Sequence, residues 1–98
     1  MKLFAIRRPM GWKTPEDLAE AAAVSARVGD EEMSSDIRWI RSYVVVEANG
    51  SLGTICIYEA SSADKIREHA ERAGLPATEI WEGADTVIVR QDPVAAAA

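Results

Sequence analysis

The dipeptide Asn49-Gly50 separates two apolar segments of similar length and predicts a β-hairpin. Both residues tolerate the positive φ angles of a two-residue type I′ turn, and Asn-Gly between alternating apolar runs is the strongest short hairpin signal. The expected strands are residues 37–46 and 52–60. A turn of known length decides which residues face each other, and so which side chains share a face of the sheet. With these two loop residues, Val44 is expected opposite Ile55, and Tyr43 opposite Cys56.

The predicted hairpin has two chemically different faces. One face is aliphatic, and we expect helices to pack against it. The other is rich in aromatic and polar side chains, which suit a partner surface better than water. A symmetric homodimer would cover that face. The expected helix-facing residues are Ile40, Val44, Val46, Ile55 and Ile57, and the expected dimer interface consists of Trp39, Arg41, Tyr43, Val45, Cys56 and Tyr58.

Two segments carry the signals of helix ends. Thr14-Pro15 places an N-cap residue before a proline at the first helical position, and Gly29 is the expected end of this first helix. The second helix is expected to begin after the serine pair 61–62 and to end at Gly74, which a leucine and a proline follow.

The remaining apolar alternation predicts a strand at each end of the chain. Residues 2–8 alternate and end at Pro9, and a last strand is expected over residues 79–90, most regular at 86–89. The order βαββαβ predicts an α+β, ferredoxin-like sandwich with a four-stranded antiparallel sheet and two helices on one face. We expect residues 1–91 to form this single domain and the assembly to be a dimeric α+β barrel. The final residues, 92–98, are expected to be a disordered tail.

Composition excludes several classes of partner. The net charge is −5, and no Lys/Arg cluster with interleaved aromatic residues occurs, which argues against nucleic acid. No apolar run approaches the ~20 residues of a membrane span, and no signal-peptide segment is recognisable, so we expect a cytoplasmic protein without a membrane partner. The single cysteine, Cys56, cannot form an internal disulfide and is expected to be a small buried hydrophobe.

His69 is the only histidine and the main candidate for chemistry. Helical periodicity places it at the edge of the apolar stripe of the second helix, at the boundary between core and water. Glu59 and Ser42 are the nearest polar residues that the predicted register supplies, and an imidazole beside a carboxylate can act as a general base or a metal ligand. A purely structural, hydrogen-bonded histidine is the other interpretation. Trp12 is either a lid over this site or a surface aromatic residue.

Four motifs together resemble a known family. They are RWIRSY at residues 38–43, TICIYEA at 54–60, IREHA at 66–70 and AGLPA at 73–77. The chain is similar in these segments to a bacterial family of short ferredoxin-like proteins, described as a domain of unknown function or as nickel-responsive, nickel-binding proteins. The resemblance implies a homodimer that binds a transition metal, and it implies no established reaction.

The chain departs from the metal-binding members of that family in its single histidine. A nickel site with His69 and Glu59 as ligands would need water, further carboxylates or a second subunit. We therefore expect a small dimeric protein that binds a small ligand or a divalent metal, nickel by resemblance. Two alternatives stay open, namely a cofactor-independent enzyme of isomerase or monooxygenase type with His69 as acid and base, and a non-catalytic docking subunit of a larger enzyme. The sequence identifies no catalytic residues beyond that alternative.

Overall fold

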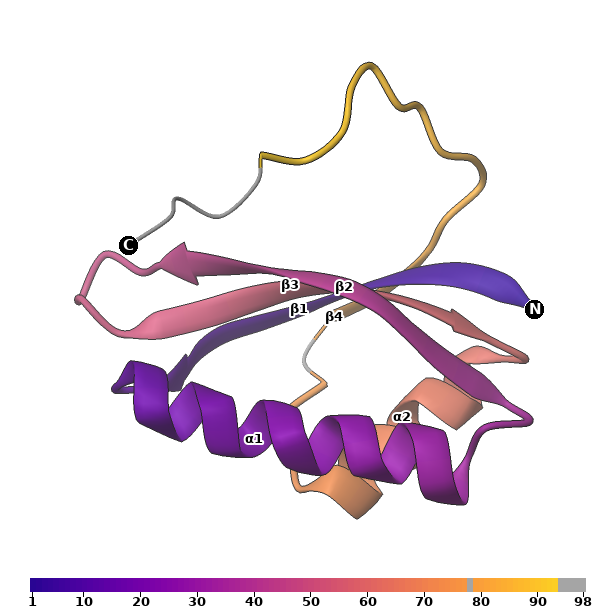
Figure 1. The fold of residues 1–98 in the computed structure, drawn as a ribbon, viewed down its shortest axis with the longest axis horizontal. Coiled ribbons are helices and arrows are strands. Elements are labelled where there is room, and N and C mark those ends of the chain that lie inside the picture. The colour runs from indigo at the N-terminus through magenta and orange to yellow at the C-terminus, as the bar shows by residue number, and fades with distance from the viewer. Residues whose placement is uncertain (78, 94–98) are drawn as a thin grey trace.

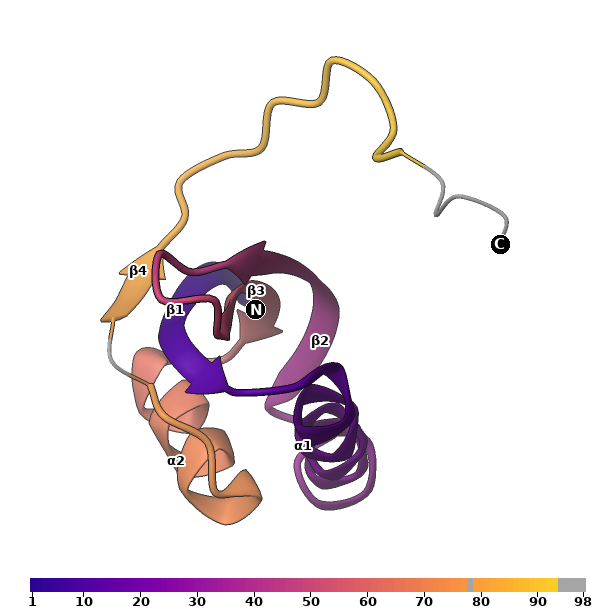
Figure 2. The ribbon, with the colours of Figure 1, turned by 90° about the vertical axis from the view of Figure 1, so that its left-hand side faces the viewer.

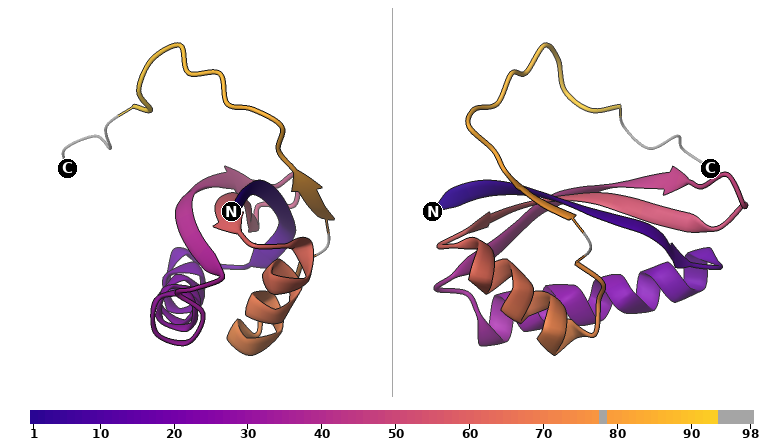
Figure 3. Two further views of the ribbon diagram at one scale, coloured as in Figure 1. Left: turned by 90° about the vertical axis from the view of Figure 1, so that its right-hand side faces the viewer. Right: turned by 180° about the vertical axis from the view of Figure 1, so that it is seen from behind.

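A computed structural model describes residues 1–77 and 79–93 of the chain. One antiparallel sheet with the strand order β2-β3-β1-β4 is covered on one face by both helices (Figure 1), which confirms the predicted ferredoxin-like α+β fold. The sheet is curled, with α1 beneath β2 and α2 beneath β1 and β4 (Figures 2 and 3). No described helix is long and apolar enough to cross a membrane. The elements are β1 (Lys2–Trp12), α1 (Pro15–Arg27), the π-helical segment η1 (Val28–Glu32), β2 (Ile37–Val46), β3 (Leu52–Ala60), α2 (Ala63–Ala73) and β4 (Glu79–Glu82).

The helix ends follow the sequence signals in three of four cases. Thr14 Oγ1 accepts a hydrogen bond from the backbone N–H of Asp17, and Ser62 caps α2 in the same way. Gly74 ends α2 in the left-handed conformation, with φ of 69°. The expected stop at Gly29 is wrong, because the chain continues through η1 to Glu32.

The loop between β2 and β3 differs from the predicted type I′ turn. Residues 47–51 form it, since Val46 pairs with Leu52 as the last strand pair. The N–H of Gly50 donates to the carbonyl of Glu47, and the N–H of Glu47 donates to the carbonyl of Ser51. Gly50 has φ of 86°, whereas Asn49 has no positive φ. Because Glu47 is hydrogen-bonded to Ser51, the turn itself consists of the three residues 48–50, with Gly50 as the bulge residue at its end.

The longer loop shifts the register of β2 on β3 by one residue. Tyr43 faces Ile55, and Val44 faces Thr54. Because a one-residue shift moves every side chain to the other face, the predicted faces of β3 are exchanged. Thr54, Cys56 and Tyr58 are buried beneath the helices, while the predicted helix-facing residues Ile55 and Ile57 lie on the open face and Val46 is largely exposed.

A second irregularity in β2 reverses the orientation of the side chains at the beginning of the strand, so that Trp39 faces the helices. The register changes between Trp39 and Arg41, so that Ile40 is the extra residue of a bulge. Trp39 pairs with Tyr58 and packs against the core. Arg41 and Tyr43, beyond the bulge, belong to the open face.

The first strand is longer than predicted. It continues past Pro9 to Trp12, with a register shift against β3 between Arg8 and Trp12. A proline is tolerated in a strand at such an irregularity, because a ladder hydrogen bond is already missing there. Met10 has φ of 50°, and its N–H donates to a carboxylate oxygen of Glu47.

The last strand is much shorter than the predicted residues 79–90. β4 ends at Glu82, which pairs with Phe4 of β1, and Gly83 makes one more hydrogen bond to Leu3. The pairing is antiparallel, so the next residues of β4 would need partners beyond the beginning of β1. Residues 86–89 therefore have no neighbouring strand among residues 1–77 and 79–93, and the segment arches away from the sheet (Figure 1). Asp92 lies at its end, and residues 94–98 of the expected tail are outside the described residues.

The core lies between the sheet and the helices and includes the histidine. His69 is 1% exposed, not at a boundary with water as predicted. Its Nε2 lies 3.0 Å from the carbonyl oxygen of Ser25, which only accepts, so Nε2 carries the proton. Burial lowers the pKa of His69 from its ordinary value, and the positive charge of Arg8 adds to this effect, while the Ser25 carbonyl opposes it.

Replacing Gly50 by valine should destabilise the protein, because it places a β-branched residue at positive φ. The expected loss is about 1 to 3 kcal/mol in the free energy of unfolding, measured by denaturant titration. Ala48→Val, in the same loop without a positive φ, is the control. Equal stability of Gly50→Val and the parent would contradict the assigned loop geometry.

The buried histidine should make stability depend on pH. A histidine whose folded pKa is lowered takes up its proton first in the unfolded chain, so the free energy of unfolding should fall as the pH drops below about 6.5. His69→Gln lacks this titration, whereas the carboxylates act alike in both proteins. The difference between their denaturation curves across pH 5 to 7.5 isolates His69, and parallel pH profiles would contradict its buried neutral state.

Candidate functional site

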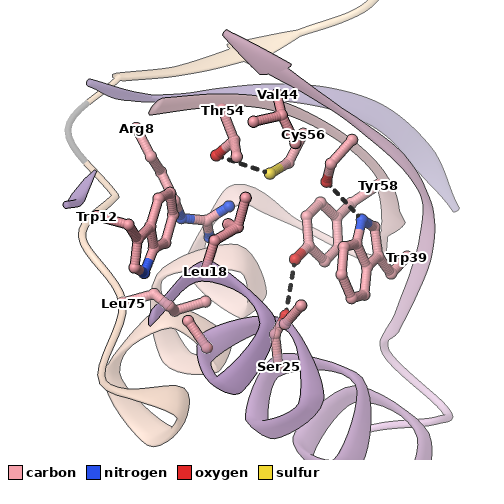
Figure 4. A pocket seen from close by; sticks show the side chains of 13 residues that line it. Arg8, Trp12, Leu18, Ser25, Trp39, Val44, Thr54, Cys56, Tyr58 and Leu75 are labelled. Atoms are coloured by element: carbon pink, nitrogen blue, oxygen red, sulfur yellow. Dashed lines mark hydrogen bonds between the residues drawn. The ribbon is translucent and has the colours of Figure 1, made fainter. Parts of the chain in front are cut away.

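An apolar cavity of about 180 Å³ lies between the sheet and α1 (Figure 4). Three strands and α1 contribute most of its lining, and the segment after α2 closes one end. The lining residues are Arg8, Trp12, Leu18, Ala21, Ala22, Ser25, Trp39, Ser42, Val44, Thr54, Cys56, Tyr58 and Leu75.

The cavity exists because α1 presents small side chains to the sheet. Leu18, Ala21, Ala22 and Ser25 follow the i, i+3, i+4, i+7 spacing of one helix face. Three of these four residues are alanine or serine, so they do not fill the space beneath β2 and β3. The spacing of these four residues can be recognised in the sequence, but the cavity between them and the sheet cannot be predicted from it.

Aromatic rings form much of the wall. The rings of Trp39 and Tyr58 stack with centroids 6.0 Å apart and planes within 9° of parallel. The indole N–H of Trp39 donates to Ser42 Oγ at 2.8 Å, which holds this ring in place. Trp12, half-buried at the end of β1, lines the cavity as well. A flat apolar molecule would meet aromatic surfaces here.

A short hydrogen-bonded series links the cavity wall to the histidine. The hydroxyls of Tyr58 and Ser25 lie 3.1 Å apart, and Ser25 Oγ lies 3.5 Å from His69 Nε2. Burial raises the pKa of Tyr58, partly offset by the hydrogen bond from Ser25 and the charge of Arg8. The phenol therefore stays protonated at neutral pH and can donate a hydrogen bond.

Arg8 is a functional candidate that the sequence reasoning missed. It is 1% exposed, its Nε donates to the carbonyl oxygen of Pro76 at 2.6 Å, and its guanidinium carbon lies 5.8 Å from the centre of the Tyr58 ring. A signal was present, because Arg8 continues the alternation of Phe4 and Ile6 on the buried side of β1. A cation at the third position of an apolar face is a departure from that pattern.

The structure separates the four ligand-binding residues expected from the sequence. Ser42 and Trp12 line the cavity. His69 is not among the lining residues and lies behind Ser25. Glu59 is on the open face of the sheet, where it pairs with Leu3 of β1 and makes an ion pair with an arginine at 2.7 Å.

The predicted metal ligands are therefore not brought together. The sheet lies between His69 and Glu59, and no group of three or more His, Cys, Asp or Glu side chains within residues 1–77 and 79–93 is placed to hold a metal ion. The Cys56 thiol is buried and donates to Thr54 Oγ1. This donor set does not fit a nickel site within one chain.

The expected dimer interface is divided between the two faces. Trp39, Cys56 and Tyr58 lie on the helix side, and their assignment to the open face is wrong because the hairpin register differs. Arg41 and Tyr43 are exposed on the open face, where both contact the carboxylate of Asp92. These two residues and Val45 remain predicted interface residues.

Comparison with known proteins identifies the family. The crystal structure of SCO4226 from Streptomyces coelicolor A3(2) has the same fold, with a TM-score of 0.69 and 24% sequence identity over 87% of this chain and 99% of that chain. No curated protein matches the chain. The family model described as nickel responsive protein SCO4226-like matches residues 4–82. The resemblance seen in the sequence motifs is thus confirmed, and the chain belongs to the SCO4226-like family of nickel responsive proteins.

Proposed function

We propose that this protein binds a small, mostly apolar molecule in the cavity between the sheet and α1. The observation that carries the proposal is the partly open apolar cavity itself, about 180 Å³ in a chain of 98 residues. Protein cores are packed almost as densely as organic crystals, and an unfilled apolar space loses the dispersion contacts of its lining. A bound apolar molecule would restore these contacts.

The volume limits the size of the ligand. An apolar protein cavity of about 150 Å³ stays dry and binds benzene. At about 180 Å³, the cavity here suits a single ring or a short branched chain with a small substituent. The polar groups on the wall, among them the Ser42 and Tyr58 hydroxyls, are few and would orient the ligand.

Trp12 is the proposed lid of this site. Its backbone follows the register shift in β1, and its half-buried indole covers one end of the lining. Strand irregularities of this kind re-aim side chains next to binding sites. A rotation of the indole would open the cavity without disturbing the sheet.

We also propose a homodimer through the open face of the sheet. Tyr43 is 42% exposed and Trp81 is 52% exposed on that face, and the aliphatic residues between them are only partly buried. Residues 86–89 add three strongly exposed apolar β-branched side chains, and no strand in the described part of the chain pairs with them. Burying these surfaces against a second copy would remove a large apolar area from water. The aliphatic residues are Leu3, Ala5, Val45, Ile55 and Ile57.

An acid–base enzyme is the second candidate function, supported by the series from Tyr58 through Ser25 to His69. In this proposal Tyr58 meets the substrate, because it lines the cavity, and acts on it as a hydrogen-bond or proton donor, while Ser25 and the Nε2–H of His69 hold its hydroxyl in place. Because Nε2 carries the proton of the neutral imidazole, His69 donates toward Ser25 and accepts no proton there. His69 would then act through Ser25 and Tyr58, without touching the substrate.

Nickel binding is supported by the family description alone. His69 offers one buried imidazole, and the carboxylate of Glu59 is on the other face of the sheet. Nickel in proteins usually has several nitrogen, oxygen or sulfur ligands. A nickel site would therefore need donors from two copies of the chain, which makes it depend on the proposed dimer.

Filling the cavity should abolish ligand binding while leaving the fold intact. Ala22→Phe adds a ring where α1 faces the cavity, and Ala23→Phe adds the same ring on the exposed side of the helix as a control. We expect toluene to quench or shift the tryptophan fluorescence of the parent and of Ala23→Phe, but not of Ala22→Phe. Absence of toluene binding by the folded parent would refute the cavity as a binding site.

A charge on the open face should prevent dimer formation. Tyr43→Asp removes an aromatic ring and places a carboxylate beside Asp92, so we expect a monomer by sedimentation velocity at tens of micromolar. Val46→Asp, near the end of the same strand and already 79% exposed, is the control and should remain dimeric. A monomeric parent would exclude the dimer and favour a docking role for the open face.

A further inference from the structure

Arg8 is buried without a counter-ion. No carboxylate within residues 1–77 and 79–93 lies within ion-pair distance of it, and its Nη2 is buried with no hydrogen-bond partner there. Its neighbour Arg7 points to the other face and shows the usual solution, because its Nη2 donates to both carboxylate oxygens of Glu47, at 2.7 and 3.0 Å. Arg7 therefore has a carboxylate partner, whereas Arg8 has none among the described residues.

A buried, unpaired charge is costly, and proteins usually pair such charges or neutralise them. A guanidinium group carries its charge in proteins, so burying Arg8 buries a full positive charge. The ring of Tyr58 and the carbonyl of Pro76 compensate it only in part. An anion bound beside it would supply the missing charge.

The guanidinium is also placed where a ligand would lie. Arg8 lines the apolar cavity, and Figure 4 shows its side chain reaching inward from β1 toward the middle of the lining residues. The contact between Nε and Pro76 fixes one edge of the group. Nη2 is the buried nitrogen of this group that has no partner among the described residues, so it is the donor available to a carboxylate oxygen of a ligand.

Resting on the proposed function, we propose that the ligand of the cavity is a small aromatic carboxylate, with its carboxylate on Arg8 and its ring between the indoles of Trp12 and Trp39. One cation balances one carboxylate, whereas a phosphate would bring a further charge into an apolar lining. The aromatic wall favours a ring over an alkyl chain. The volume of about 180 Å³ suits an acid of the size of phenylacetate.

The test compares an acid with its neutral isostere. Phenylacetate and phenylacetamide have the same shape, and titration calorimetry at pH 7.5 measures both on three proteins: the parent, Arg8→Met and Arg7→Met. Methionine keeps an unbranched apolar stem and removes the charge. Arg7→Met is the matched control, because it removes a neighbouring cation of the same strand from the opposite face.

We expect the parent and Arg7→Met to bind phenylacetate at least ten-fold more tightly than phenylacetamide, and Arg8→Met to lose this preference while still binding the amide. Equal binding of the two probes by the parent would overturn the carboxylate assignment and leave the cavity function standing. Binding of neither probe, nor of toluene, would refute the proposed function itself. The comparison on the parent decides the assignment even if Arg8→Met does not fold.

Discussion

The alternation of side chains along β3 is the constraint on which the rest of the structure depends. β3 is a central strand, paired on both sides, and its residues Thr54, Cys56 and Tyr58 face the helices. Together with Phe4, Ile6 and Arg8 of the neighbouring central strand β1, these residues form the middle of the sheet that the core and the cavity contact. Successive side chains of a strand point to opposite sides of the sheet. The length of the loop after β2 therefore determines which side chains of β3 contact the helices and which lie on the open face.

The cavity follows from a mismatch in size across this interface. Tyr58 and Trp39 are large and stacked on each other, whereas α1 opposes them with alanines and a serine. Dense packing would have required bulkier residues on α1. The same face of the sheet includes Arg8, whose charge is poorly compensated by protein groups. An apolar cavity and an uncompensated buried cation both lower the stability of the fold. A ligand with a ring and a carboxylate would fill the cavity and neutralise the charge of Arg8.

Family membership and donor chemistry point in different directions for nickel. The family is described as nickel responsive, yet His69 is enclosed by Ser25, Tyr58 and the backbone of Gly29. An imidazole with its Nε2 committed to a carbonyl and its Nδ1 buried has no open path to a metal. A response to nickel therefore does not follow from the arrangement of one chain, and the cavity is the feature of this chain that best supports a binding role.

The sequence by itself determined the order of elements, the capped helix starts and the strand bounds of the hairpin, because caps, prolines and alternation act over a few neighbouring residues. Ser42, expected on the helix side of the sheet, does line the cavity, although the register that placed it there was wrong, and the sequence left the place of Trp12 open. Only the tertiary structure decided the faces of β3, the length of β4 and the burial of His69. The glycine bulge and the bulge at Ile40 are set by the pairing of β2 with β3, and the length of β4 is set by where β1 begins. These pairings join separate strands, and no pattern within one strand encodes them.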